Sequence, residues 1–144
     1  MTHYADSSFL VSCYLLDANT PQAKSYLSGI SVALAWTGLH ALEVRNAFEL
    51  GVFRSLISRA DVTAAWANLQ NDLRKGRLAR VSIRWSSALR QAARLSERHV
   101  ATTGTRSLDI LHVAAAKSIR ATQFISFDGR QRALAAAAGL KVAP

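Results

Sequence analysis

The sequence contains little cysteine or proline, and this excludes several classes of protein. A single cysteine, Cys13, can form no internal disulfide, so the chain is not a small disulfide-stabilised scaffold. The 2 prolines and 7 glycines form no linker-like stretch. Half of the residues are hydrophobic, which disfavours disorder. We therefore expect a single domain over residues 1–144, long enough for one sizeable core.

Long hydrophobic runs are also missing. No apolar stretch reaches the roughly 18 residues needed to span a bilayer. The N-terminal run "FLVSCYLL" is short and is preceded by Asp6 instead of a basic region. It also lacks the small-residue cleavage site of a signal peptide. We expect a cytoplasmic protein without a membrane partner.

Acidic residues are scarce relative to basic ones. The 9 Asp and Glu residues face 18 Lys and Arg residues, which gives a formal net charge of +9 and a pI of about 10.8. Arginine dominates the basic set and suits recognition of phosphate. A nucleic acid is therefore the first partner to consider, although an acidic protein partner or a basic surface kept for solubility would give the same composition.

Apolar runs with the pattern of short strands alternate with helical patterns along the chain. Strands are predicted up to Asp6 and over residues 31–36, 79–83, 122–128 and 141–143. This alternation predicts an α/β fold with a parallel sheet covered by helices on both faces. In such folds the site lies outside the carboxyl ends of the strands. Asp6 and Asp128 each end a predicted strand, at the edge where a site is expected.

Four of the nine acids have apolar neighbours. Asp6, Glu43, Asp109 and Asp128 occur in "YADSS", "ALEVR", "SLDIL" and "ISFDG". Each has an ordinary explanation when taken singly. Asp6 and Asp128 could cap helices, Asp109 could complement a helix dipole, and Glu43 could be solvated. The remaining acids lie at helix edges or beside basic and amide residues, as solvated charges do.

The four acids taken together favour a metal site. Grouped carboxylates repel one another unless a cation neutralises them. A site made only of oxygen ligands suits Mg²⁺ or Mn²⁺. On a basic protein, such a site points to a phosphodiester substrate, for which a divalent ion polarises the phosphoryl oxygen and activates a water.

At these residues the sequence resembles the PIN-domain ribonucleases, and most of all the VapC toxins of bacterial and archaeal toxin–antitoxin systems. The matching segments are "YADSSFLV", "HALEVRNA", "TRSLDILHVAAA" and "FISFDGRQRALAAAAGLKV". The resemblance implies a three-layer α/β/α sandwich with a central parallel sheet, cleavage of RNA with Mg²⁺ or Mn²⁺, a cognate antitoxin and a homodimer. It also implies that Asp6 and Asp109 are the principal metal ligands and that Glu43 and Asp128 complete the catalytic acids. Ser7 matches the family's supporting hydroxyl residue.

Several other residues have two interpretations. His40 lies three residues before Glu43, and His112 three residues after Asp109, so each pair shares a helix face. Each pair could belong to a mixed His/carboxylate site for iron or manganese, but we expect buried, hydrogen-bonded histidines that are not metal ligands. Arg106, just before the Asp109 helix, is a candidate RNA phosphate contact or a surface arginine. A row of basic residues could line an RNA path, meet an acidic antitoxin, or simply be solvated: Arg90, Arg94 and Arg98.

The sequence thus predicts a divalent-metal-dependent endoribonuclease, the toxin of a type II toxin–antitoxin pair. Two alternatives remain open at this point. One is an RNA-processing PIN nuclease without a toxin role, and the other is a catalytically silent nucleic-acid-binding PIN module.

Overall fold

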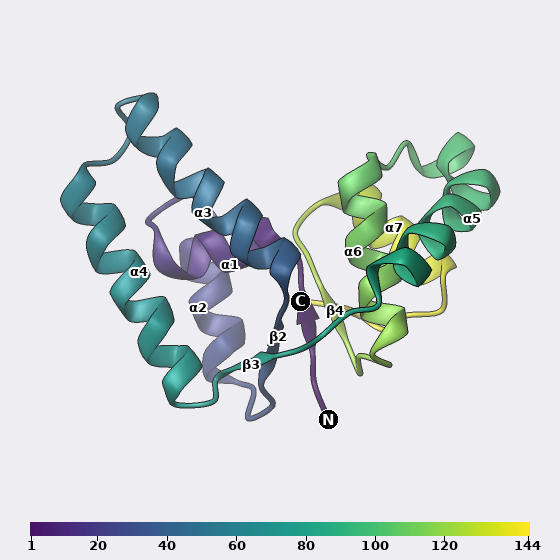
Figure 1. Cartoon of the computed structure of the whole chain (residues 1–144), viewed down its shortest axis with the longest axis horizontal. Helices are drawn as coiled ribbons and strands as arrows, with labels where there is room; N and C mark the ends of the chain where they lie inside the picture. Colours follow the sequence, from purple (N-terminus) through teal and green to yellow (C-terminus); the bar gives the residue numbers. More distant parts are fainter. The chain divides into compact units, whose positions relative to one another are not determined.

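A computed structural model describes residues 1–144 (Figure 1). The chain divides into two compact units. Unit 1 contains residues Met1–Asp6 and Ser82–Pro144, and unit 2 contains Ser7–Val81. Each unit has its own parallel strands and its own helices, so the predicted α/β class with a parallel sheet is confirmed.

Unit 1 contains three short parallel strands in the order β1-β4-β5. They are β1 (Tyr4–Ala5), β4 (Phe124–Ile125) and β5 (Val142–Ala143). In the register, Tyr4 pairs with Phe124, and Phe124 pairs with Val142. The residues of β1 and β4 are completely buried. This fits a parallel strand that helices cover on both faces, and it explains why these segments are apolar throughout.

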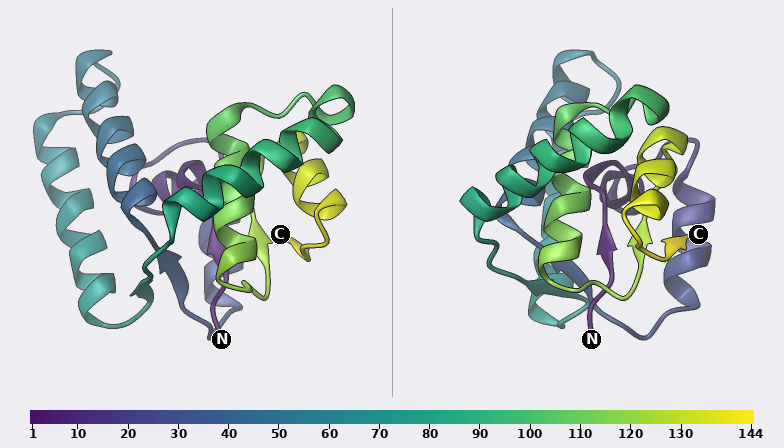
Figure 2. Two further views of the ribbon diagram at one scale, coloured as in Figure 1. Left: turned by 45° about the vertical axis from the view of Figure 1, so that its right-hand side comes forward. Right: turned by 90° about the vertical axis from the view of Figure 1, so that its right-hand side faces the viewer.

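Three helices belong to unit 1 and lie beside these strands (Figure 2). They are α5 (Trp85–Thr103), α6 (Ser107–Ser118) and α7 (Gly129–Ala137). Helix α6 is the most buried, because every residue from 110 to 116 lies in the core. Helix α5 is amphipathic and ends at Gly104, whose φ of 66° is the left-handed conformation that glycine adopts readily. The chain can therefore turn sharply from α5 into α6.

Unit 2 contains a pair of parallel strands, β2 (Leu34–Trp36) and β3 (Leu78–Arg80). Leu34 pairs with Leu78 and Trp36 with Arg80. Four helices complete this unit: α1 (Ser7–Tyr14), α2 (Thr20–Ser28), α3 (Gly38–Phe53) and α4 (Arg59–Arg74).

Capping boxes start the two long helices of unit 2. The Ser58 hydroxyl accepts a hydrogen bond from the backbone N–H of Asp61, and the Asp61 carboxylate accepts one from the backbone N–H of Ser58. Thr37 and His40 make the same reciprocal pair at the start of α3. Such caps satisfy backbone donors that have no partner within the helix.

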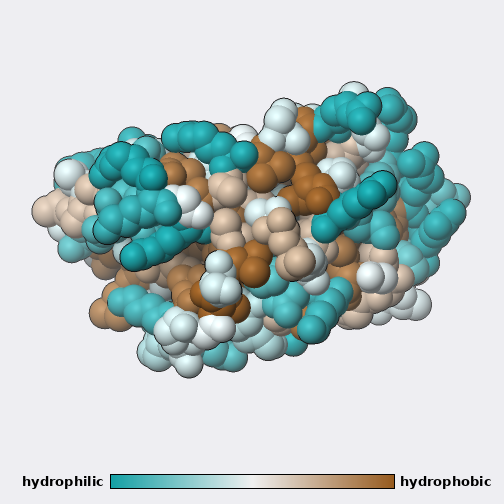
Figure 3. All heavy atoms as spheres, turned by 90° about the horizontal axis from the view of Figure 1, so that it is seen from below, coloured by the Kyte–Doolittle hydropathy of each residue, from teal (hydrophilic) through white to brown (hydrophobic).

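Some large apolar side chains remain on the surface. The hydropathy view in Figure 3 shows hydrophobic atoms exposed among hydrophilic ones on one face. The most exposed large hydrophobic residues include Leu16, Phe53 and Leu56 in unit 2. None of the helices combines the length and the apolar composition that crossing a membrane requires.

Candidate functional site

Asp6 ends β1 at the carboxyl edge of the strands in unit 1. Its backbone N–H donates to the carbonyl of Ile125 at 2.9 Å, which continues the pairing of β1 with β4. The residue is only 5% exposed. Burial of a carboxylate is costly unless charge or hydrogen bonds compensate it. The carboxyl edge of parallel strands is where ligands bind in such folds, so the position of Asp6 makes it a candidate for a functional group.

Asp109 is the third residue of α6, in the first turn of a helix that the core fixes firmly. Its Oδ2 atom accepts a hydrogen bond from Nε of Arg106 at 3.0 Å, and the two side chains form an ion pair. The side chain of Asp109 is 21% exposed and that of Arg106 is 78% exposed. Arg106, the predicted phosphate contact, is thus paired with Asp109, the predicted metal ligand, in this structure.

A buried hydrogen bond fixes α6 against β1. The Tyr4 hydroxyl and Nδ1 of His112 are 2.8 Å apart. Tyr4 and Asp6 are alternate residues and face the same side of the strand. Asp109 and His112 are one helical turn apart and share a face of α6. Asp6 therefore lies on the side of β1 that faces α6, and Asp109 lies on the face of α6 that faces β1.

Asp128 follows β4 and caps α7. Its Oδ1 atom accepts from the backbone N–H of Gln131 at 2.9 Å, and its own N–H donates to Oγ of Ser126 at 3.0 Å. The cap interpretation of Asp128 is correct. A metal role is compatible with it, because Oδ2 of Asp128 makes no hydrogen bond in the structure.

Gln131 links Asp109 and Asp128 through hydrogen bonds, and the sequence analysis did not identify it. Its side chain is completely buried in α7. The amide oxygen accepts from Ser126 Oγ at 2.7 Å, and the amide nitrogen donates to the carbonyl of Asp109 at 3.2 Å. The start of α6 is thereby fixed beside the carboxyl end of β4. The available signal was a lone glutamine three residues after a capping aspartate in an alanine-rich helix.

The charges of Asp109 and Asp128 both act on Arg106. The hydrogen bond and the charge of Asp109 raise the pKa of the Arg106 guanidinium, and the charge of Asp128 adds to this effect. Together with the Gln131 bridge, this places Asp109 and Asp128 at one edge of unit 1. The backbone N–H of Asp6 pairs with β4 in the same unit. Its grouping with Asp109 and Asp128 in one site remains a prediction.

Glu43 and Ser7 are the predicted site residues of unit 2. The Ser7 hydroxyl, at the start of α1, donates to Oε1 of Glu43 in α3 at 2.9 Å. Ser7 is buried. The structure therefore brings the predicted supporting hydroxyl to the predicted catalytic glutamate. The joining of this pair with the three aspartates remains a prediction.

The two helical histidines have structural roles, as the sequence predicted. His40 is fully buried, and its Nδ1 atom accepts from the backbone N–H of Thr37 at 3.0 Å in the α3 cap. His112 is also buried and contacts the Tyr4 hydroxyl.

The donor chemistry of the aspartates fits a hard divalent cation. Mg²⁺ is often bound through one or two carboxylates, with water and substrate phosphates as further ligands. Asp6 and Asp109 would supply these carboxylates. No group of three or more His, Cys, Asp or Glu side chains forms a preassembled metal cage. In this structure Asp109 is held by Arg106 and one oxygen of Asp128 by the α7 cap.

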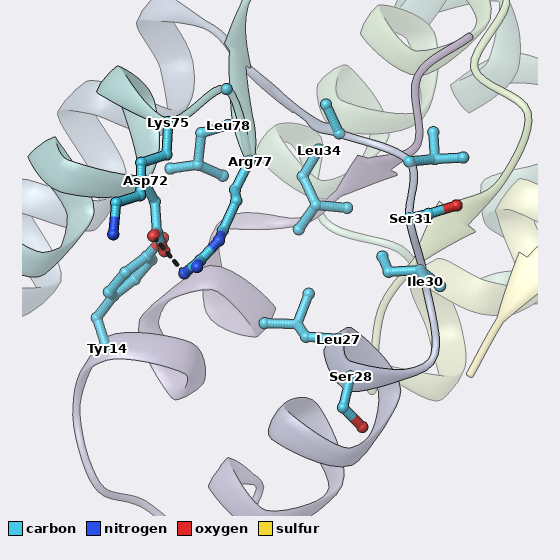
Figure 4. Close-up of a pocket in the computed structure, with 13 residues that line it drawn as sticks. Tyr14, Leu27, Ser28, Ile30, Ser31, Leu34, Asp72, Lys75, Arg77 and Leu78 are labelled. Carbon is cyan, nitrogen blue, oxygen red and sulfur yellow. Dashed lines mark hydrogen bonds and ion pairs between the residues drawn. The ribbon is translucent and has the colours of Figure 1, made fainter.

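A cavity of about 540 Å³ lies within unit 2, at the amino ends of β2 and β3 (Figure 4). Its wall carries a small polar network in which Asp72 accepts from the Tyr14 hydroxyl at 2.8 Å and from Nη1 of Arg77 at 3.0 Å. The rest of the lining is mainly apolar and includes Leu27, Ile30, Leu34 and Leu78. None of the predicted site acids lines this cavity.

The Tyr14 hydroxyl predicts a pH dependence of stability. Burial, and then the hydrogen bond to Asp72, raise the pKa of Tyr14 above its ordinary value of 10.0. Above about pH 10 the tyrosine ionises in the unfolded chain but stays neutral in the folded one, so its contribution to stability is lost as pH rises. Tyr14→Phe should weaken the fall in the free energy of unfolding above pH 10, measured by denaturant unfolding at several pH values. An unchanged slope would contradict this.

Comparisons with known proteins give matches only among solved structures. No protein-family model and no curated protein matches the chain. The crystal structure of VapC20 from Mycobacterium tuberculosis, a toxin that cleaves the sarcin–ricin loop, has a TM-score of 0.67 at 18% identity. The match covers 97% of this chain and 96% of that one.

Two further solved structures agree with this likeness. VapBC2 from Rickettsia felis, bound to a DNA fragment from its promoter, has a TM-score of 0.63 at 12% identity and covers 99% of this chain and 98% of that one. FitAcB from Neisseria gonorrhoeae has a TM-score of 0.62 at 16% identity, covering 100% and 97%. The chain therefore has the fold of the VapC-type PIN-domain toxins, which confirms the resemblance at the level of fold.

Proposed function

We propose that this chain, with the fold of the VapC-type toxins, is a divalent-metal-dependent endoribonuclease. We also propose that it is the toxin of a type II toxin–antitoxin pair and that a cognate antitoxin protein restrains it. The observation that supports the proposal is the burial of Asp6 directly after β1, in the same unit in which Gln131 links the start of α6, and so Asp109, to the Asp128 cap of α7. These acids belong to a chain with a formal net charge of +9.

The charge distribution supports a phosphodiester substrate. A basic protein attracts a polyanion over its surface. Three carboxylates at one edge would repel the same polyanion if nothing neutralised them. A bound Mg²⁺ or Mn²⁺ would supply that positive charge and polarise the phosphoryl oxygen. A phosphodiester substrate and a divalent cation together account for a basic protein with an acidic site.

The candidate residues of unit 1 would have different roles in catalysis. Asp6 and Asp109 would hold the cation, because Asp6 is buried at the strand end and Asp109 is fixed by the packed helix α6. Asp128 keeps Oδ1 on the α7 cap, which leaves Oδ2 to accept a proton from the attacking water. Arg106 is exposed, and its guanidinium would exchange Asp109 for the substrate phosphate.

The proposed reaction is a hydrolysis. The water oxygen attacks phosphorus in line, and the bond between phosphorus and the 3′ oxygen breaks. The products are a 5′ phosphate and a 3′ hydroxyl, with the water supplying the proton that the 3′ oxygen takes. Ser7 would hold Glu43 in place through their hydrogen bond, and Glu43 is the fourth carboxylate of the proposal.

The test is cleavage of total cellular RNA by the purified protein, free of antitoxin, with Mn²⁺ or Mg²⁺ and with EDTA. The proposal expects cleavage with metal, none with EDTA, and none from Asp6→Asn, which also controls for contaminating nuclease. Direct ligation of an adapter to the products should succeed, because they carry 5′ phosphates. Cleavage that persists in EDTA or leaves 5′ hydroxyls would contradict the proposed chemistry.

A further inference from the structure

Helix α5 presents a row of arginines to solvent. The three arginines are four residues apart, so neighbouring members are about 6 Å apart along the helix axis and the row spans about 12 Å. All three are exposed. The opposite face of α5 is buried in unit 1, through Ala88, Ala92 and Leu95. Figure 2 shows the course of the helix. We call Arg90, Arg94 and Arg98 the α5 row.

The α5 row makes no ion pair within the protein. Ion pairs occupy other arginines of the chain, such as Arg59 with Glu49 and Arg77 with Asp72. No acidic side chain lies within ion-pair distance of the row, although Glu97 belongs to the same helix. Three unpaired guanidinium groups on one surface repel one another slightly and stabilise nothing in the fold. Their charge is therefore available to an external anion.

The α5 row leads toward the aspartates of unit 1. Helix α5 ends at Gly104, and the next residue, Thr105, donates from its hydroxyl to the carbonyl of Arg130 at 3.1 Å. The Arg130 side chain passes Gly104, with its Cδ atom 3.9 Å from the point where a Cβ would be. Arg106 follows and binds Asp109. Arg130 is exposed as well. Basic groups thus continue from α5 to the edge that carries the acids.

The surface around the α5 row fits a phosphate backbone better than a protein. Protein interfaces concentrate aromatic and large apolar residues at their centre. Leu89 is exposed at the start of the row, but the solvent-facing positions between the arginines, Ala93 and Glu97, are small or charged. Regularly spaced arginines without an apolar centre are suited to successive phosphates, which they bind through planar, forked N–H donors.

We propose that the α5 row binds successive phosphates of the RNA strand outside the cleaved bond, and so positions the substrate at the aspartates. The inference rests on the proposed function and adds the surface that holds the substrate. At a rise of about 3.4 Å per nucleotide, the 12 Å of the row spans three to four nucleotides. Each arginine then neutralises about one phosphate, and the contacts are independent of base sequence.

The experiment compares two triple variants in the Asp6→Asn background, in which RNA is bound but not cut. One is R90Q/R94Q/R98Q. The matched control, K24Q/R54Q/R74Q, removes three exposed cations of unit 2 that also lack ion-pair partners. Both lower the formal net charge from +9 by three. Fluorescence anisotropy of a labelled single-stranded RNA oligonucleotide gives the affinity over a range of salt concentrations.

The α5 variant should bind about 10- to 100-fold more weakly than its Asp6→Asn parent at low salt. The slope of log affinity against log salt concentration should shrink by about 2, since each phosphate contact to a single strand contributes about 0.7. The control should keep nearly the parent slope. R90K/R94K/R98K should recover most of the slope, because charge remains, and its recovery also shows that the positions tolerate substitution.

Equal slopes for the α5 variant and the control would overturn the inference, because the effect would then be one of net charge. An α5 variant that binds RNA as its parent does would also overturn it and would leave an acidic protein as the partner of this surface. Cleavage by the otherwise unchanged protein separates the two proposals. If it cuts RNA and the slope is unaltered, only the role of the α5 row fails.

Discussion

Asp109→Asn should abolish metal-dependent cleavage of RNA. The substitution keeps the size of the side chain but removes the negative charge that a divalent cation needs. Loss of several kcal/mol of transition-state stabilisation corresponds to a rate reduction of about 1000-fold or more. The measurement is the initial rate of cleavage of a labelled RNA at saturating Mn²⁺.

Stability without metal should change little in Asp109→Asn. The ion pair with Arg106 is largely exposed, and such pairs contribute about 0 to 1 kcal/mol. A carboxylate in the first turn of a helix contributes a similar amount, and relief of repulsion from Asp128 acts in the opposite direction. The free energy of unfolding in EDTA should therefore stay within about 1 kcal/mol of the parent value.

Asp61→Asn is a matched control, because Asp61 is also the third residue of its helix and also accepts local hydrogen bonds. It should leave cleavage unchanged. Unfolding of Asp109→Asn in the absence of metal would instead identify Asp109 as a structural residue. An equal loss of activity in both variants would point to a general effect on folding.

Gln131→Leu should lower both stability and cleavage. Leucine cannot accept the hydrogen bond from Ser126 Oγ or donate one to the Asp109 carbonyl, and all of Gln131 is buried. A buried polar group left without a partner costs about 1 to 3 kcal/mol. The start of α6, which carries Asp109, also loses its hydrogen bond to α7. A small misplacement of a catalytic group lowers the rate by up to about 100-fold. Denaturant unfolding and cleavage rates measure the two effects.

Gln22→Leu provides the control for Gln131→Leu. Gln22 lies on the exposed surface of α2, so the same substitution should change stability by less than about 0.5 kcal/mol. A Gln131→Leu protein with full stability would show that the buried bridge is not needed. A protein that loses stability but cleaves RNA at the parent rate would show that the bridge does not position Asp109.

The order of strands and helices could be predicted from the sequence because hydrophobic pattern and caps are local. The strand predicted at 79–83 illustrates the limit. In the structure β3 ends at Arg80, and the N–H of Val81 makes one more bond to the Trp36 carbonyl. The length of β3 is set by its partner β2, which is only three residues long. No signal within 79–83 contains that information.

The positions of the candidate acids in the fold could also be predicted, but most of their hydrogen-bond partners could not. Asp6 and Asp128 were identifiable because they end apolar segments, and the structure places them there. The Gln131 bridge to Asp109 depends on tertiary packing of α6 and α7. The sequence gives the spacing of Gln131 from Asp128 but not its distance from Asp109, 22 residues away. The pairing of Ser7 with Glu43 likewise joins helices that only the fold brings together.

Binding of a divalent cation by Asp6 and Asp109 can be measured directly, without RNA, by thermal unfolding over a series of Mn²⁺ concentrations. A ligand that binds only the folded state stabilises it by RT ln(1 + [L]/Kd), about 2.7 kcal/mol at a hundredfold excess over Kd. We expect the melting temperature of the parent protein to rise with Mn²⁺ and that of Asp109→Asn to stay constant. Equal rises in both proteins, or no rise in the parent, would contradict a metal site at these carboxylates.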